Sequence, residues 1–471
     1  MNKLFTAFGV VIIFFSFSAC SFKPELTITP TLAVQNNWHE TYEQQSSLAL
    51  QTENQAALAW IKPLLDDNSY QLVLQAIRQN LNLRQSAASL VQAKLNIDIE
   101  ESQYLPNLDG RFFASRNDSG DNNYGLALSS GVSLDVWGQL SERVQQKIIQ
   151  FEQQSIRYYQ QQFEFSVSLV THYLKLKKTE QIIALLEQRL INVKSQLSSA
   201  EEQYKAGLVN LANVYQARNN VQGVKGQLLR EKNSLKRLSH ELPLLFGLPP
   251  MAISHRVKAF TLPDELPVLP RILPADLLTL RADIRLAWLD VLKQQSEVAI
   301  AYANRFPRFS LSANASSSSD SLSDLVKLGD IGWNLGANIA GPIFNAGRLK
   351  NKAKQAQIDL DKTEYRYKNT AYNAFKQVEN LFSQRELTQL ENMLNEQTYQ
   401  NVEQALTLAQ RQYQQGLIEY KDYLANQRNF FSAQISQLNL QYQQIFDHLN
   451  LLVALGGGWA VELNVEANNE R

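Results

Sequence analysis

The sequence is poor in cysteine and histidine and has no excess of charge of either sign. Its 471 residues include one cysteine, which excludes a disulfide framework and a cysteine-based metal site within one chain. The five histidines are far apart and form no H-x-x-x-H pair, and no P-loop, G-x-S-x-G or Rossmann fingerprint is present. The 45 basic and 45 acidic residues cancel, so nothing indicates a nucleic-acid partner. We therefore predict no enzyme, no catalytic residue and no resident metal or cofactor.

The single cysteine, Cys20, closes a segment with targeting character. Lys3 precedes an almost wholly apolar stretch, 4–17, which is too short to span a membrane. We interpret 1–19 as a secretory signal peptide. Its ending, Phe17-Ser18-Ala19-Cys20, resembles a bacterial lipobox, in which the cysteine carries diacylglycerol and acyl chains and anchors the mature chain. Phe17 replaces the usual leucine, and the alternative is a plain signal peptide with a chance cysteine.

The stretch Tyr124–Trp137 carries the clearest strand pattern. Every second residue from Tyr124 to Val136 is apolar except Ser130, and the intervening positions are small or polar. Side chains alternate between the two faces of a strand, so this pattern predicts one apolar face. Soluble strands average about 5–6 residues, whereas outer-membrane barrel strands need roughly 9–11. We therefore interpret the stretch as a membrane strand.

Two hairpins of this kind are expected. Strand 107–116 precedes the turn-rich loop 117–123 and the return strand, which together make hairpin 107–137. On strand 107–116, Phe113 is an exception to the apolar–polar alternation. Strand 309–316 and a return strand from residue 331 make the second hairpin, 308–343.

Helical periodicity fills most of the remaining chain. It predicts single helices over 69–104 and 275–304, each ending before a proline, and proline-free helices from Gly138 to about Lys205 and from Arg348 to about Gln414. Helices of that length indicate a coiled-coil or helical-barrel setting. Two further helices carry heptad seams, Val214, Val221, Leu228, Leu235 and Leu242 in one, and Leu424, Phe431, Leu438, Ile445 and Leu452 in the other.

These elements occur in the same order twice. Matched residues are 201 apart before the hairpin loop (84 and 285, 106 and 307) and 209 apart after it (204 and 413, 207 and 416). The chain is a tandem duplication of helix, hairpin, long helix, turn and helix. The expected organisation is a signal peptide 1–19, a lipid-anchored equatorial segment 20–68, repeat 1 over 69–250, a linker 251–274, repeat 2 over 275–455 and a tail 456–471.

Four strands cannot close a barrel, and an unpaired edge cannot stand in hydrocarbon. Known single-chain barrels have about eight strands or more, so each copy must share a barrel with others. The competing interpretation is a soluble coiled-coil lipoprotein with a small β-domain. The strands argue against it, because a soluble hairpin with so much exposed apolar surface would aggregate.

Four segments resemble the TolC-type outer membrane factors, specifically the lipidated NodT/OprM-like efflux branch. They are the strand-to-helix corner 134–138 (LDVWG), its second copy 341–348 (GPIFNAGR), the paired turns 203–218 and 412–428, and the tail 454–459 (ALGGGW). The resemblance covers nearly the whole mature chain. It implies an α+β membrane protein that forms a homotrimer, with a twelve-stranded outer-membrane β-barrel continuous with a twelve-helix periplasmic α-barrel.

Glycines mark the corners and turns of both repeats. Gly138 and Gly347 stand where strand gives way to helix, and Gly207 and Gly416 stand between antiparallel helices. Tyr204 and Tyr413 lie one helical turn before the latter pair and are expected to brace the tip. The ordinary interpretation of any one glycine is a helix C-cap.

The resemblance implies that the second turn lines a periplasmic gate, with Tyr413 close to it. Family members often place acidic rings six and nine residues after the glycine. Asp422 occupies the first place and Ala425 the second, while Lys421 stands where an apolar gate residue is common. Three Asp422 carboxylates would repel one another and attract cations. The alternative, equally weighted, is that Glu419, Lys421 and Asp422 form a solvated charged face.

The resemblance implies the exit duct of a tripartite efflux system in the outer membrane of a Gram-negative bacterium. The expected partners are outer-membrane lipid, an inner-membrane pump of RND type and a periplasmic adaptor that docks around Gly207 and Gly416. Transport within the duct would be passive. The alternatives are the outer-membrane component of an ABC-driven protein secretion system and a structural envelope lipoprotein.

Overall fold

The computed structural model describes residues 67–118, 120–250, 274–325 and 331–456. The predicted signal peptide, Cys20, most of the equatorial segment, most of the linker and most of the tail lie outside the described residues. Within the described part, no helix combines the length and the apolar character needed to cross a membrane.

The described elements follow the duplicated order. Repeat 1 comprises α2 (Asp67–Gln79), α3 (Leu81–Glu101), β1 (Asn107–Arg116), β2 (Asn122–Leu134), α4 (Gln139–Lys205) and α5 (Leu211–Leu245). Repeat 2 comprises α6 (Leu277–Leu280), α7 (Ala282–Ala303), β3 (Arg308–Ser319), β4 (Gly332–Ala340), α8 (Arg348–Gln414) and α9 (Tyr420–Ala454). Helices α4 and α8 each contain 67 residues, so the two long helices of the duplication have equal length.

The chain folds into two compact units, and each unit contains segments of both repeats. One contains Ser89–Gln154 and Leu286–Asn369, and the other contains Ser155–Arg285 and the chain from Thr370. The first unit therefore holds all four strands, and the second holds both helix–turn–helix hairpins. The repeats are units of sequence rather than separately packed domains.

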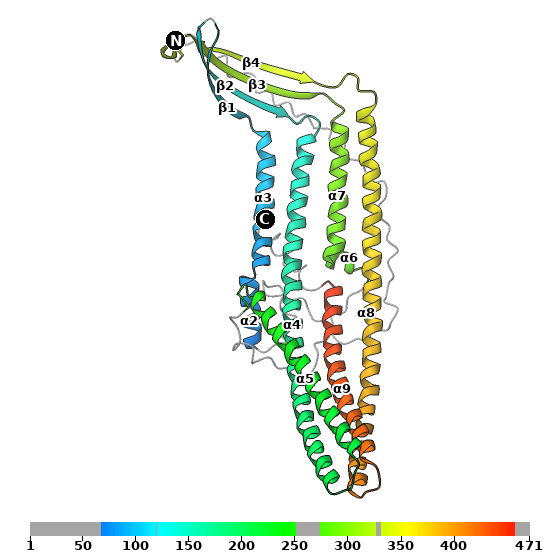
Figure 1. Ribbon diagram of the computed structural model, residues 1–471. Coiled ribbons are helices and arrows are strands. Elements are labelled where there is room, and N and C mark those ends of the chain that lie inside the picture. The colour runs from blue at the N-terminus through cyan, green and yellow to red at the C-terminus, as the bar shows by residue number, and fades with distance from the viewer. Residues whose placement is uncertain (1–66, 119, 251–273, 326–330, 457–471) are drawn as a thin grey trace. The chain divides into compact units, whose positions relative to one another are not determined.

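The four strands form one antiparallel sheet in the order β1-β2-β3-β4 (Figure 1). The central pair, β2 with β3, joins the two repeats, so that Leu128 faces Ala315 and Val132 faces Leu311. Strands β1 and β4 are the edges of this four-stranded sheet.

The register places the apolar residues of all four strands on one face of the sheet. Leu126 lies opposite Phe112, and Ala313 lies opposite Leu335. The face is open to solvent in the single chain, and its exposed large side chains are Leu108, Phe112, Leu126, Leu128, Leu134, Leu311, Trp333, Leu335 and Ile339. The opposite face carries Ser, Asn and Gly at the alternating positions. The strands therefore have the expected apolar and polar faces, and strand pairing aligns these faces across the sheet.

Phe113, the exception on the polar face, is accommodated by a glycine. It pairs with Gly125, and a Cβ atom on Gly125 would collide with the Phe113 ring. The Arg111 guanidinium lies 5.9 Å from the centre of the same ring. A glycine–aromatic pair thus lets one large ring lie flat on the otherwise polar face.

The helices expected as single elements over 69–104 and 275–304 are each interrupted. The first breaks at Asn80, whose Oδ1 accepts hydrogen bonds from the backbone N–H groups of Asn82 and Leu83 at 3.0 and 3.1 Å and so caps α3. The second breaks at Arg281, which has extended backbone angles between α6 and α7. The return strand β2 also ends at Leu134 rather than continuing to Trp137.

The core of the second unit lies between α2, α4, α5 and α9. Its members include Val73, Leu174, Leu242 and the fully buried Tyr442. Both heptad seams point into helix–helix contacts: Val214, Val221 and Leu228 are buried on α5, and Leu424, Phe431 and Ile445 are buried on α9.

Candidate functional site

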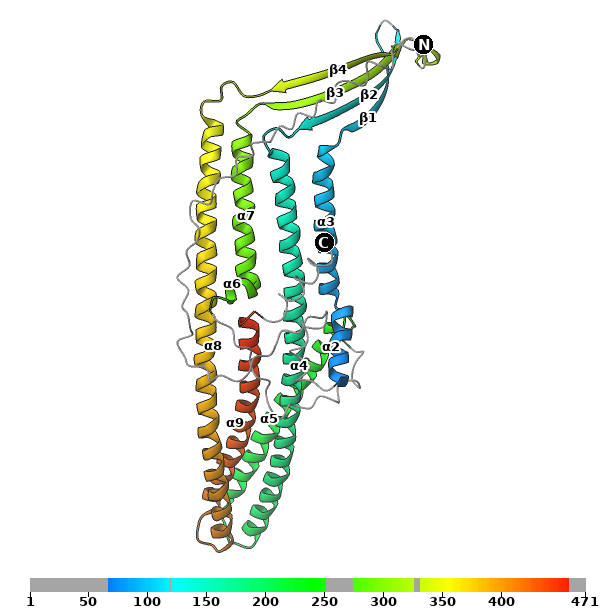
Figure 2. The same cartoon turned by 180° about the vertical axis from the view of Figure 1, so that it is seen from behind.

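The tips of the two helical hairpins lie side by side in both views (Figure 2). Each turn is closed in the same way. The N–H groups of Gly207 and Gly416 donate to the carbonyls of Tyr204 and Tyr413 at 2.9 Å, and the following residue donates to the carbonyl one position earlier. Both glycines have positive φ, 74° and 72°, which side chains resist.

Aromatic side chains of repeat 2 fill the space between the tips. The ring of Tyr413 stacks on that of Tyr423 at 5.5 Å and meets that of Tyr420 at the same distance. Tyr420 is buried against Ala200 of α4 and Ala217 of α5. Burial raises the pKa of the Tyr420 phenol, and the nearby Tyr413 and Tyr423 raise it further. Tyr420 therefore stays neutral at physiological pH.

One hydrogen bond joins the two tips directly. The Tyr413 hydroxyl donates to Oε1 of Gln203, on α4, at 3.1 Å. Tyr204, its partner in the duplication, is exposed and makes no such contact among the described residues. A second bond, from Nε2 of Gln196 to Oε1 of Gln427, joins α4 to α9 at 2.6 Å. Of the two tyrosines expected to brace the tip, Tyr413 is the one that bonds to the other hairpin among the described residues.

The charged residues of the second turn are exposed in the single chain. Lys421 forms an ion pair with Glu419 at 2.9 Å, and this contact raises the pKa of the Lys421 ammonium, with a smaller contribution from Asp422. Asp422 is exposed on the first turn of α9. Each copy contributes one Asp422, so an acidic ring of this residue would require other copies of the chain.

The strand-to-helix corners use the other two predicted glycines. Gly138 and Gly347 have φ of 72° and 81°. Between Leu134 and α4, the Asp135 carboxylate accepts the backbone N–H groups of Leu140 and Ser141, each at 2.8 Å, and so caps the long helix.

A contact between the first corner and the segment before β3 is an addition to the sequence-based expectations. Trp137 Nε1 donates to the Pro307 carbonyl at 2.7 Å, and its ring stacks on Phe306 at 4.7 Å. Gly341 lies against the same proline, because a Cβ atom there would stand 2.8 Å from the Pro307 Cα. Pro307 is therefore contacted by both strand-to-helix corners.

A second matched pair of contacts lies where the short helices meet the ends of α5 and α9. Asn80 Nδ2 donates to the Leu245 carbonyl at 3.1 Å, and Arg281 Nη1 donates to the Ala454 carbonyl at 2.7 Å. These positions correspond in the duplication, because 281 − 80 = 201 and 454 − 245 = 209. We call the two arrangements the Asn80 and Arg281 junctions.

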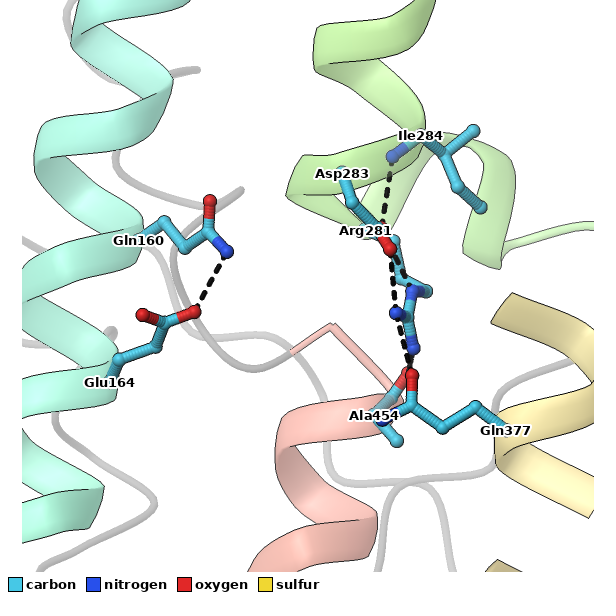
Figure 3. Close-up of polar contacts among 7 residues, drawn as sticks. All are labelled: Gln160, Glu164, Arg281, Asp283, Ile284, Gln377 and Ala454. Atoms are coloured by element: carbon cyan, nitrogen blue, oxygen red, sulfur yellow. Dashed lines mark hydrogen bonds and ion pairs between the residues drawn. The ribbon is translucent and has the colours of Figure 1, made fainter. Parts of the chain in front are cut away.

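The Arg281 side chain makes charged bonds in addition to the one with Ala454 (Figure 3). The guanidinium makes a bidentate pair with Asp283 and also donates to Gln377 Oε1 on α8 at 3.0 Å. Asp283 Oδ1 in turn accepts the N–H of Ile284 at the start of α7. One guanidinium therefore links α7, α8 and α9.

Comparison with known proteins gives the family. The model of the family described as "Outer membrane efflux protein" matches residues 72–248 and 273–457. The solvent efflux pump outer membrane protein SrpC of Pseudomonas putida is 28% identical, over 94% of this chain and 97% of its own. The probable outer membrane lipoprotein SilC of Salmonella typhimurium is 26% identical, over 85% and 88%. The crystal structure of the CmeC outer membrane channel of Campylobacter jejuni covers 95% of this chain and 98% of its own, with a TM-score of 0.82 and 21% identity.

The duplicated arrangement of helices and hairpins, with a family match over most of the chain, defines an outer-membrane channel. The chain belongs to the outer membrane efflux protein family. The predicted family, duplicated fold, outer-membrane location and channel function are thereby confirmed, and the protein is a transport component rather than an enzyme.

Proposed function

We propose that three copies assemble into a passive exit duct for small molecules. The observation that carries this proposal is the continuous apolar face of a sheet with two edges, β1 and β4. Four strands per copy and three copies give twelve strands, enough for a closed barrel with polar residues inside. Closure supplies partners to both edge strands, and lipid covers the apolar face.

The helices flanking the sheet support the same assembly. Val91, Leu95 and Ile99 of α3 are each more than half exposed, and so are Ile358 and Tyr365 of α8. Spacings of four residues in α3 and of seven in α8 place each set on one helix face. In the assembly, the α3 stripe of one copy packs on the α8 stripe of the next, which buries both sets.

The mass of the detergent-solubilised protein, measured by light scattering and native mass spectrometry, tests this assembly. We expect three copies and discrete conductance in planar bilayers. A monomer that stays in solution without detergent and shows no conductance would favour the structural lipoprotein instead.

We propose that the tip is the periplasmic gate and the docking region of an adaptor, with an RND-type pump supplying energy. In a trimer the exposed Asp422 residues would form a cation-attracting ring, for which Lys421 and Glu419 provide neighbouring charge. Asp422→Asn should then reduce cation selectivity and block by divalent cations in single-channel recordings. Asn426→Asp, one turn along α9, is a control for charge near the tip. Unchanged selectivity in Asp422→Asn would instead support a solvated charged face made of Glu419, Lys421 and Asp422.

We propose that the mature chain is anchored through lipid on Cys20, as the name of SilC indicates for that relative. Metabolic labelling with palmitate should mark the wild type and not Cys20→Ala. The cargo class is best found by deleting the protein and measuring susceptibility to solvents, antibiotics and metal cations, because SrpC is named for solvents and another relative, CusC, for cations.

A further inference from the structure

A groove of about 650 Å³ lies where α4, α5 and α9 meet, away from the tip turns and the strand-to-helix corners. Its apolar lining includes Ile182 and Leu186 of α4, Leu238 of α5 and Ile435 of α9. The lining residues of α4 run from Lys175 to Arg189, a span of about 20 Å at 1.5 Å per residue. The groove is therefore elongated, and it is bounded by helices of both repeats.

The same groove is strongly cationic. Lys175, Lys178, Arg189 and Arg230 line it, and Glu231 is its one lining carboxylate. Neighbouring cations on these helices are neutralised, as Lys177 pairs with Glu180 and Lys232 pairs with Glu187. The four lining cations form no ion pair within 4.0 Å in the described part of the chain. With four cations against one carboxylate, the lining of the groove carries an excess of positive charge.

Arg189 is the most unusual of these cations, because it is only 8% exposed. Its guanidinium lies over the Phe431 ring at 5.3 Å, and no described carboxylate pairs with it. Burial lowers the pKa of Arg189, and the nearby Arg428 lowers it further, while burial also lowers the pKa of Lys178. Burying a cation without an anionic partner costs free energy, so an anion bound beside Arg189 would lower that cost.

We propose that this groove binds an amphiphilic organic anion, with its carboxylate or sulfonate at Arg189 and Lys178 and its apolar body along Ile182 and Leu186. The guanidinium and ammonium supply charge-assisted hydrogen bonds to the head group. The apolar lining matches a hydrocarbon or aromatic body, since ligand sites combine apolar walls with a few polar anchors.

Fluorescence of 11-(dansylamino)undecanoic acid, titrated onto the full-length protein in a non-ionic detergent, tests the proposal. We expect a saturable component above the micelle background in the wild type. Arg189→Gln and Lys178→Gln should each weaken it by about tenfold, the loss expected for one charge-assisted hydrogen bond. Lys232→Gln, at a paired cation outside the groove, should bind as the wild type does.

Lys178→Gln is the second variant in case Arg189→Gln misfolds, because Lys178 is less buried than Arg189. Equal probe binding in both groove variants and the wild type would overturn the proposal. Competition fixes the ligand class: decanoate should displace the probe at far lower concentration than inorganic phosphate. Displacement by phosphate as readily as by decanoate, or equal binding of a neutral dansyl alkyl amide, would also overturn it.

Discussion

Gly247 and Gly456 occupy matched positions at the ends of α5 and α9, and both have positive φ. A Cβ atom on Gly247 would lie 2.6 Å from the Gln79 carbonyl oxygen, and one on Gly456 would lie 2.8 Å from that of Leu280. Both obstacles are backbone atoms that cannot move aside. We expect Gly247→Ala and Gly456→Ala each to destabilise the protein by about 1–3 kcal/mol, through strain and the collision.

Gly223 is the matched control, because it lies inside α5 with no atom within 4 Å of its added Cβ. Gly223→Ala should stabilise by about 0.5–1 kcal/mol, since alanine favours the helix. Melting temperatures by circular dichroism in detergent compare the three variants. A similar shift in all three would show that the two junction glycines are ordinary helix ends.

His448 should make stability depend on pH. It is buried on α9, and neither ring nitrogen has a hydrogen-bond partner among the described residues. Burial lowers its pKa to about 4, and Arg385 adds to the effect. The unfolded chain takes up the proton near pH 6.5 and the folded chain does not, so this contribution is full above about pH 6.5 and is lost as pH falls toward 4.

The loss amounts to at most about 3 kcal/mol across that interval. His448→Leu removes the titrating group, so the fall in melting temperature between pH 7 and pH 4 should be smaller than in the wild type. His240→Leu, at an exposed histidine on α5, should keep the wild-type slope. An identical pH slope in His448→Leu and the wild type would contradict the assignment.

Among elements, the two helix junctions are alike in position and different in strength. Asn80 offers one neutral donor to the end of α5, whereas Arg281 ties α9 to α7 and α8 with charged bonds. We expect Arg281→Gln to lower the hydrogen-exchange protection of the last turn of α9 by about tenfold or more, since bonds to charged groups contribute about 1.5–3 kcal/mol. Asn80→Ala should affect the last turn of α5 less, and equal losses would show that the charge adds nothing.

If the tip is the gate proposed above, the hydrogen bond between the two tips should favour its closed state. Tyr413→Phe removes the hydroxyl that reaches Gln203 but keeps the ring stacked on Tyr423. One neutral hydrogen bond contributes about 1 kcal/mol, so the open state should gain about fivefold in population. Single-channel recordings measure this, with the exposed Tyr204→Phe as the control expected to behave as the wild type.

Periodicity identified the long helices and the strands because each pattern is local to its element. The breaks at Asn80 and Arg281 were missed, since their causes include bonds to carbonyls 165 and 173 residues away. Matched spacing identified the four turn and corner glycines, which all take positive φ. The Tyr413–Gln203 and Trp137–Pro307 contacts could not be predicted, because they depend on which elements of the two repeats become neighbours.

For the molecule as a whole, the two faces of the sheet should respond oppositely to the same charge. Leu335 is 75% exposed on the apolar face of β4, and Asn338 lies on the polar face of the same strand. Because an arginine on the lipid side of a barrel costs about 2–4 kcal/mol near the bilayer centre, Leu335→Arg should reduce assembled trimer in the outer membrane. Asn338→Arg places the same side chain toward the interior of the proposed barrel, so assembly should proceed as in the wild type.

Membrane fractionation followed by unheated gel electrophoresis measures assembled trimer for both variants. Asn338→Arg adds positive charge to the interior and should shift ion selectivity toward anions, a change that Leu335→Arg has no reason to cause. If Leu335→Arg assembled normally and Asn338→Arg did not, the apolar face would line the interior instead. The polar face of the sheet would then face the lipid, and the proposed barrel would be wrong.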